Sequence, residues 1–149
     1  MRSTHTQLYI HMIWGTWDRL PLITTEIEPR LFAAIMEKCK ELSCEPLAIG
    51  GIGDHVHLLV RLHPTVAVAE LVKGVKGSSS HFVTHEVMPD QFFKWQGSYS
   101  LTMLTENRLL ALRDPWGNRP LCIGALDGEH YVIASETCAL NVVDARYLR

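Results

Sequence analysis

The chain has 149 residues, of which 47% are hydrophobic and 20% are charged, and this composition excludes a disordered protein. The length suits either one domain or a domain of about 100 residues with an appendage. The net charge of −2 excludes a strongly basic protein, so nucleic-acid binding would have to rest on a local patch. No apolar run is long enough to cross a bilayer and the N-terminus lacks a signal-peptide core, so we expect a cytoplasmic protein without membrane contact.

The first two predicted elements are a strand and a helix. Residues 7–14 (QLYIHMIW) are rich in β-branched and aromatic side chains and stop at Gly15, which favours a strand. Thr25 and Glu28 have the spacing of a capping box, and apolar residues then recur at helical intervals. The pattern predicts a helix over 25–43.

Two strands and a tight turn follow. Residues 46–52 and 55–62 are short apolar runs, and the glycines and Asp54 between them are typical of a turn. We therefore expect these two strands to be antiparallel neighbours.

The last elements of this half are a helix and a strand. Thr65 can cap a helix whose apolar stripe runs from Val68 to Phe82 and whose other face carries Lys73 and Lys76. Small residues at 74 and 77–80 weaken helix propensity, which indicates either a kink or a close approach of another group. Residues 94–103 favour a strand.

This order of elements predicts an α+β, ferredoxin-like fold, in which a βαββαβ chain forms an antiparallel sheet with two helices on one face. We assign residues 1–104 to this domain and 105–149 to a short β-rich appendage that is not an independent domain. The other face of the sheet is then free and open to a polymer.

His55 and His57 are the residues whose spacing predicts chemistry. Side chains alternate across a strand, so both imidazoles should project from the same face while Val56 and Leu58 point into the core. Two adjacent imidazoles can bind a divalent cation if a third ligand is supplied, and Gln96, Glu106 and Asn107 are chemically able to supply it. The alternative is a pair of half-exposed surface histidines. Asp54 either orients a histidine or is an ordinary turn residue.

Several separated blocks resemble the HUH single-tyrosine transposases of small insertion sequences, including the repetitive-palindrome-associated branch. The resemblance covers approximately residues 9–104. Its blocks are Trp14-Gly15-Thr16 with Arg19, the segment 54–60 (DHVHLLV), the segment 64–79 from Pro64-Thr65-Val66 to Lys76-Gly77-Ser78-Ser79, and Trp95-Gln96-Gly97 with Tyr99. The order of these blocks is more specific than the two histidines alone.

The resemblance implies a homodimer that cuts and rejoins single-stranded hairpin DNA. It implies that His55 and His57 hold Mg or Mn, which would polarise the scissile phosphate for attack by a tyrosine, giving a phosphotyrosine intermediate. We predict DNA contacts by a set of basic and hydroxyl side chains, with Trp14 or Trp17 as stacking faces: Arg19, Arg61, Lys73, Lys76, Ser78 and Ser79. The alternatives are a solvated helix face for the lysines and a core position for Trp14.

The chain departs from that family after Tyr99, because the helix that carries the nucleophilic tyrosine is not present. Residues 113–124 (RDPWGNRPLCIG) and 130–140 (HYVIASETCAL) instead resemble an internal fragment of glutamine phosphoribosylpyrophosphate amidotransferase, whose nucleophilic cysteine has no counterpart here. We infer a fusion and assign no catalytic residue, since Tyr99 matches a packing position and Tyr131 and Tyr147 lie in the fused tail.

Two hypotheses follow: a metal-dependent transposase, or a DNA-binding module of the same fold that is catalytically inactive. Glutamine amidotransfer is disfavoured. The remaining histidines share no period with the pair and are interpreted as structural or surface residues: His5, His11, His63, His81, His85 and His130.

Overall fold

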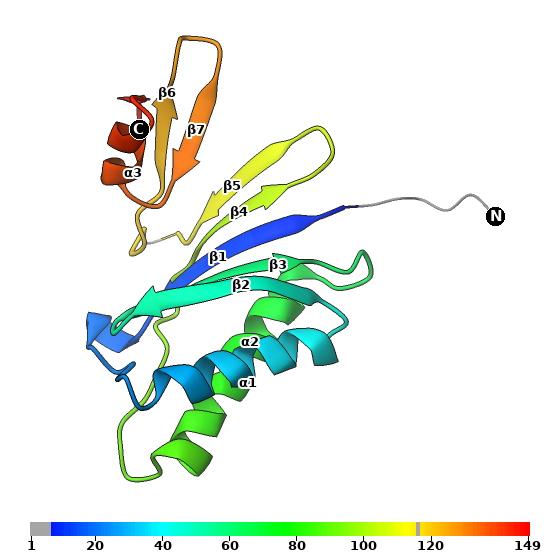
Figure 1. The fold of residues 1–149 in the computed structure, drawn as a ribbon, viewed down its shortest axis with the longest axis vertical. Coiled ribbons are helices and arrows are strands. Elements are labelled where there is room, and N and C mark those ends of the chain that lie inside the picture. The colour runs from blue at the N-terminus through cyan, green and yellow to red at the C-terminus, as the bar shows by residue number, and fades with distance from the viewer. Residues whose placement is uncertain (1–6, 116) are drawn as a thin grey trace, which may run out of the picture.

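The computed structural model describes residues 7–115 and 117–149, and its main element is a five-stranded antiparallel sheet (Figure 1). The strand order is β2-β3-β1-β4-β5. The strands are β1 (Tyr9–Gly15), β2 (Glu45–Ile52), β3 (His55–Arg61), β4 (Ser100–Leu104) and β5 (Leu109–Arg113). The first four have the order expected of the ferredoxin-like fold, which confirms the predicted fold class.

One face of this sheet carries the core. On β1 the buried residues Ile10, Met12 and Trp14 alternate with residues of the opposite face, and β3 contributes Val56 and Leu58 in the same way. Because β1 and β3 are antiparallel, with Met12 opposite Leu58, these side chains form one continuous apolar layer.

Both long helices cover that layer: α1 (Glu28–Glu41) and α2 (Val68–Phe82) lie side by side under the sheet (Figure 1). The predicted caps are wrong. The hydroxyl of Thr24, not Thr25, accepts a hydrogen bond from the Ile27 amide at 3.3 Å. The N-cap of α2 is Ala67, because Thr65 lies in the turn before the helix and its hydroxyl contacts the His63 ring instead.

The small residues of α2 mark a close approach between the helices. A Cβ placed on Gly74 would lie 2.8 Å from Leu42 Cδ1 at the end of α1, so glycine lets the helices pack closely. The helix continues through Gly77, and a π-helical turn, Val83–Val87, follows it.

The predicted strand over 94–103 begins later than expected, at Ser100. Before it the chain is held to the end of β1 by single contacts: Trp95 bridges Thr16, and the Gln96 amide donates to Gly15 O at 2.9 Å. After it β5 extends the sheet, so the sheet crosses the predicted boundary at residue 104 and ends at Arg113.

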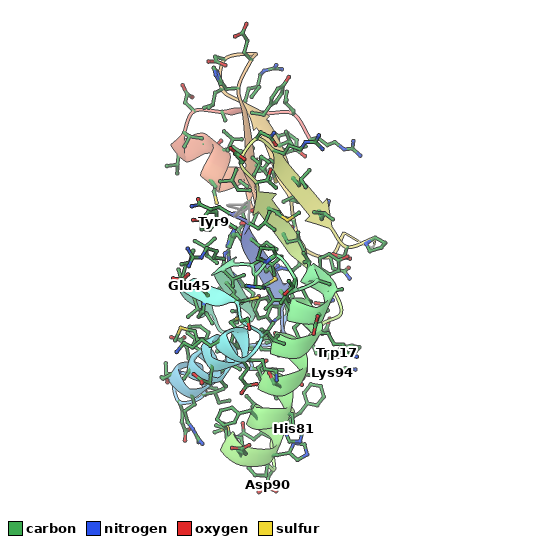
Figure 2. The ribbon with its side chains drawn as sticks, turned by 90° about the vertical axis from the view of Figure 1, so that its right-hand side faces the viewer. Tyr9, Trp17, Glu45, His81, Asp90 and Lys94 are labelled. Atoms are coloured by element: carbon green, nitrogen blue, oxygen red, sulfur yellow. The ribbon has the colours of Figure 1, made fainter. Side chains whose placement is uncertain are left out.

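The appendage begins after β5 and contains a three-stranded sheet of order β7-β6-β8 and a short helix. Its elements are β6 (Cys122–Ala125), β7 (Tyr131–Ala134), α3 (Thr137–Val142) and β8 (Arg146–Tyr147). It lies on the opposite side of the main sheet from α1 and α2 (Figure 1), and in Figure 2 it stands at the end of the molecule away from His81 and Asp90.

The predicted free face of the sheet is therefore partly covered. Ile13 and Ser100 belong to that face, yet they are only 4% and 1% exposed. The Ser100 hydroxyl donates to Pro120 O of the appendage at 3.2 Å. The prediction of a fully open face is wrong, because the appendage packs on part of it. Among the described residues, no helix combines the length and apolarity that crossing a membrane needs.

Candidate metal and nucleic-acid site

His55 and His57 project from the same face of β3, on the side opposite the core. Their ring centroids are 5.0 Å apart, and Val56 between them is fully buried on the helix side. The same-face prediction is confirmed, since the period-two alternation of an extended strand places both rings together.

His11 is a third member of the cluster that the sequence did not reveal. It lies on β1, and its Nε2 is 3.1 Å from His57 Nδ1, with the two ring centroids 5.2 Å apart. His11 was interpreted as a structural or surface residue because it shares no sequence period with the pair, and its contact with His57 was not predicted. Only the β1–β3 register, which sets Ile13 opposite His57, brings the two rings together.

Two rings of the cluster, His57 and His11, favour the neutral imidazole. Burial, followed by the positive charges that His11, His55 and Arg119 can carry, lowers the pKa of His57 to about 4 against the opposing charge of Glu136. Burial also lowers the pKa of His11. A neutral imidazole keeps a lone pair, which is the form that binds metal ions.

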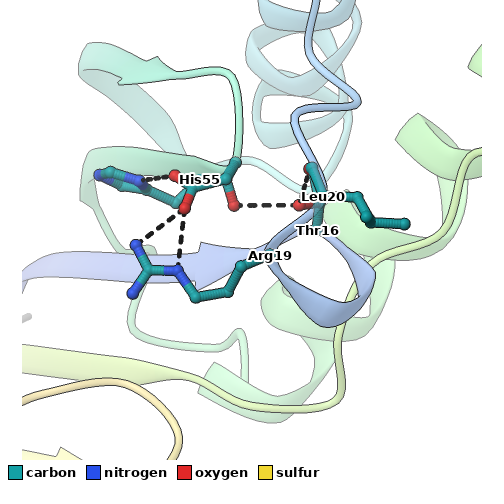
Figure 3. A network of polar contacts seen from close by, with 5 residues as sticks. Thr16, Arg19, Leu20 and His55 are labelled. Atoms are coloured by element: carbon teal, nitrogen blue, oxygen red, sulfur yellow. Dashed lines mark hydrogen bonds and ion pairs between the residues drawn. The ribbon is translucent and has the colours of Figure 1, made fainter.

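Asp54 orients His55, as one of the two alternatives for this residue supposes. The Asp54 Oδ1 and His55 Nδ1 atoms are 2.6 Å apart, and Arg19 holds the other carboxylate oxygen through Nε and Nη2 at 2.9 and 2.8 Å (Figure 3). Burial acts to raise the pKa of Asp54, but the hydrogen bonds from His55 and Arg19 outweigh it and hold that pKa below its usual value.

The loop after β1 places Arg19 for this contact. It contains a 3₁₀ turn, η1 (Trp17–Arg19), in which Asp18 and Arg19 have φ angles of 51° and 55°. The Thr16 hydroxyl contacts both Leu20 O, at 2.6 Å, and Asp54 O, at 3.2 Å, so the loop is tied to the β2–β3 turn (Figure 3).

The pair fits a divalent cation as a two-imidazole site. Nδ1 of His55 is occupied by Asp54 and Nδ1 of His57 by His11, which leaves one Nε2 on each ring as the nitrogen for a metal. Within residues 7–115 and 117–149, no three His, Cys, Asp or Glu side chains are arranged so that they could hold one metal ion together. The remaining ligands would therefore be oxygens of another kind.

Of the three predicted candidates for a further ligand, position favours Gln96. Its Oε1 would lie 4.0 Å from a Cβ on Gly15, and Gly15 is paired with His55. Glu106 and Asn107 lie in the β4–β5 turn at the opposite end of β1 from Gly15.

The predicted DNA-contact residues do not form one surface. Arg19 lies at the histidine cluster, whereas Arg61 is four residues from His57 along β3, about 13 Å away, and forms an ion pair with Glu45. Lys73 and Lys76 lie on α2, on the other side of the sheet. These assignments remain predictions.

Lys76 and the two serines have specific contacts within the protein. Lys76 Nζ donates to Gln96 O at 2.6 Å, and burial lowers the pKa of this lysine to about 8. The Ser78 hydroxyl donates to Gly74 O at 2.8 Å. Ser79 is fully buried, and its hydroxyl donates to Val75 O and accepts from Trp95 Nε1, so the prediction that Ser79 contacts DNA is wrong.

The two candidate stacking residues differ in exposure. Trp14 is only 2% exposed and packs edge-on against Trp95, which places it in the core. Trp17 is 44% exposed, and Lys94 Nζ lies over its ring, 3.8 Å from the centroid. The two residues are neighbours in Figure 2. Trp17 alone of the two offers a surface for a base.

The fold agrees with comparisons to known proteins. The family model of IS200-like transposases matches residues 4–114. The chain belongs to the IS200-like transposase family. The crystal structure of a candidate transposase from Deinococcus radiodurans has the same fold, with a TM-score of 0.61 and 24% identity, over 71% of this chain and 85% of that one.

The curated relatives that the chain matches are amidophosphoribosyltransferases. The amidophosphoribosyltransferase of Bacillus subtilis is 40% identical over 85 residues, and amidophosphoribosyltransferase 1 of Arabidopsis thaliana is 50% identical over 56 residues. These matches cover 57% and 38% of this chain but only 17% and 10% of those proteins. The chain therefore spans a small part of the relatives it matches.

Among the described residues, no tyrosine hydroxyl forms a hydrogen bond with His11, His55 or His57. Tyr99 lines a groove with Lys73 on the α2 side of the sheet, opposite the cluster. Tyr131 and Tyr147 are 62% and 57% exposed on the appendage.

Proposed function

We propose that this transposase domain binds the phosphate backbone of single-stranded hairpin DNA at the histidine cluster, with Mg or Mn held by His55 and His57, and that it does so without a covalent step. The supporting observation is the side-by-side arrangement of two imidazoles, one oriented by Asp54. A bound divalent cation would supply positive charge to a phosphate oxygen.

The chain's own residues have distinct roles in this proposal. Asp54 fixes the orientation of the His55 ring, and His11 does the same for His57. Arg19 shares Asp54 but is half-exposed, with 53% of its side chain accessible, so it can also reach a phosphate. Trp17 lies in the same loop and offers an aromatic face to an unpaired base.

The test is a binding titration of a labelled DNA hairpin with a single-stranded flank. We expect Mn²⁺ to strengthen binding by the natural chain and His57→Ala to remove that metal-dependent gain. His63→Ala is the matched control, because His63 is exposed beyond the far end of β3. Equal metal dependence in all three proteins would overturn the proposal.

Covalent strand transfer is the second candidate, favoured by the family match over residues 4–114. It would require one tyrosine to attack a phosphorus atom and form a phosphotyrosine bond while the 3′ oxygen leaves. A denaturation-resistant protein–DNA adduct that is lost in one of Tyr99→Phe, Tyr131→Phe or Tyr147→Phe would establish it. Hairpin binding without an adduct would instead support the DNA-binding function that has no covalent step.

We also propose that the domain forms a homodimer through β5. This strand is at the edge of the main sheet, and Leu110 and Leu112 on it are 39% and 45% exposed. An exposed apolar edge strand is prone to pair with another chain. Light scattering after size-exclusion chromatography should give a dimer mass, and Leu112→Lys should shift it toward the monomer.

A further inference from the structure

Arg119 is a charged residue that the appendage contributes to the transposase site. It is only 3% exposed, and neither Nε nor Nη1 of its guanidinium has a hydrogen-bond partner within the part of the chain that the structure describes. A buried cation without full hydrogen bonding is costly, so its position needs an explanation.

The guanidinium lies at the His55 end of the cluster. A Cβ placed on Gly15 would be 3.4 Å from Arg119 Nη1, and Gly15 is directly opposite His55 in the sheet. Directly opposed residues of antiparallel strands are about 5 Å apart, which brings the positive charge close to the imidazole pair. The charge of Arg119 also lowers the pKa of His57.

The backbone around Arg119 is tied to the main sheet. Arg113, the last residue of β5, donates from Nε to Arg119 O at 2.7 Å. Pro120 O accepts from the Ser100 hydroxyl on β4. Gly117 has a φ of +64°, and a Cβ there would lie 2.9 Å from the Arg113 guanidinium, so the loop is shaped for this docking.

Two carboxylates also face this region. Asp54 is already shared between Arg19 and His55, and Glu136 of the appendage is exposed. Burial and the charge of Arg19 lower the pKa of Arg119, and the two carboxylates oppose this shift. The carboxylates thus favour the charged guanidinium but do not fill its free N–H positions.

We propose that Arg119 is an internal competitor of the divalent cation, and that it weakens metal binding at His55 and His57 as long as the appendage is docked. The proposal rests on the metal site of the proposed function. A fixed guanidinium and a divalent cation beside the same two imidazoles repel each other in a poorly hydrated site, so occupation by one disfavours the other.

The experiment measures Mn²⁺ binding to the full chain by the electron paramagnetic resonance signal of free Mn²⁺. We expect Arg119→Gln to bind Mn²⁺ about tenfold or more tightly than the natural chain. Arg119→Lys keeps the positive charge, so its Mn²⁺ binding should stay as weak as that of the natural chain. Arg108→Gln is the matched control, because it removes a positive charge from the exposed β4–β5 turn. It should leave the Mn²⁺ affinity unchanged. The double variant Arg119→Gln with His57→Ala should lose the gained affinity.

Metal binding and the docking of Arg119 must weaken each other to the same extent. This gives a second measurement on the natural chain, which does not depend on how well the variants fold. If metal and Arg119 exclude each other, saturating Mn²⁺ must speed amide hydrogen exchange across residues 117–123. Equal Mn²⁺ affinity of the natural chain and Arg119→Gln, with exchange unchanged by Mn²⁺, would overturn the proposal. Mn²⁺ binding that does not depend on His57 in any variant would instead refute the metal site itself.

Discussion

The main sheet with its two helices and the C-terminal appendage differ in how they are stabilised. The first buries a single cluster that runs from Ile10 on β1 to Leu101 on β4 and includes residues of both helices. Within the described residues, the hydrophobic cluster of the appendage has only Cys122, Leu140 and Ala145 as buried members. A cluster of three small or medium side chains is too little to offset the entropy of ordering such a segment, so the appendage depends on docking to the sheet.

The chain has two kinds of similarity to known proteins. The family match ends at residue 114, next to the end of β5 at Arg113, and the described part of the appendage follows. The curated amidophosphoribosyltransferases are similar over short stretches.

The largest expected effect comes from the core strand that carries the histidines. Leu58 is fully buried on β3, so Leu58→Ala should lower the free energy of unfolding by about 2–5 kcal/mol. Leu109→Ala on β5 is the control and should change it by less than about 0.5 kcal/mol, because Leu109 is 50% exposed. Urea unfolding followed by circular dichroism measures both. Equal losses would mean that β5 is part of the core.

A smaller effect is expected at the turn that positions His55. A Cβ on Gly51 would lie 2.2 Å from His55 O, so Gly51→Ala must displace the backbone of the hairpin, with a cost of about 2 kcal/mol. Gly50→Ala is the matched control, since nothing lies within 4 Å of a Cβ there. Unfolding midpoints and the His55 ring resonances in an NMR spectrum report the change. Unperturbed resonances in Gly51→Ala would contradict this geometry.

The histidine cluster should make stability depend on pH. The pKa of His57 is lowered to about 4 in the folded chain, from 6.5, so the unfolded chain binds more protons between these values. Stability is therefore full above pH 6.5 and is lost as the pH falls toward 4. His57→Gln should weaken the pH dependence of the free energy of unfolding, by an amount equal to the uptake of up to about one proton per molecule. Thermal unfolding between pH 7 and 4.5 measures this dependence. An unchanged slope would contradict the prediction.

The smallest effect on overall unfolding is expected in the appendage. Leu140 is the most buried residue of its small cluster, so Leu140→Ala should raise hydrogen exchange and proteolysis within residues 117–149. It should change the main unfolding transition by less than about 1 kcal/mol. Val142→Ala is the control because Val142 is 86% exposed. A loss of several kcal/mol in the main transition would show that the two regions unfold together.

Much of the fold could be predicted from local patterns, but element boundaries were less accurate. The period-two pattern of 55–61 and the helical spacing of 68–82 identified β3 and α2 because each has one buried face. The caps at Thr25 and Thr65 failed because these threonines lie outside the helices. The strand predicted from Lys94 failed at its start because 94–99 pairs only through the Thr16–Trp95 bridge.

The site was predictable only along one strand. His55, His57 and Asp54 are close in sequence, so their contacts follow from strand and turn geometry. His11 and Arg119 are far away in sequence, and no pattern in the chain connects them to the pair. Ser79 failed as a DNA contact for a related reason: helical spacing does not reveal that Trp95 covers its hydroxyl.

The sequence by itself determined the alternation that puts His55 and His57 on one face, the order of the elements and the similarity to two unrelated families. The tertiary structure alone decided that His11 meets His57, that Arg119 is buried at the His55 end of the cluster and that the appendage covers part of the second face of the sheet. The physical reason is that spacing along a chain sets the direction of side chains within one element, whereas strand register and docking set which elements face each other.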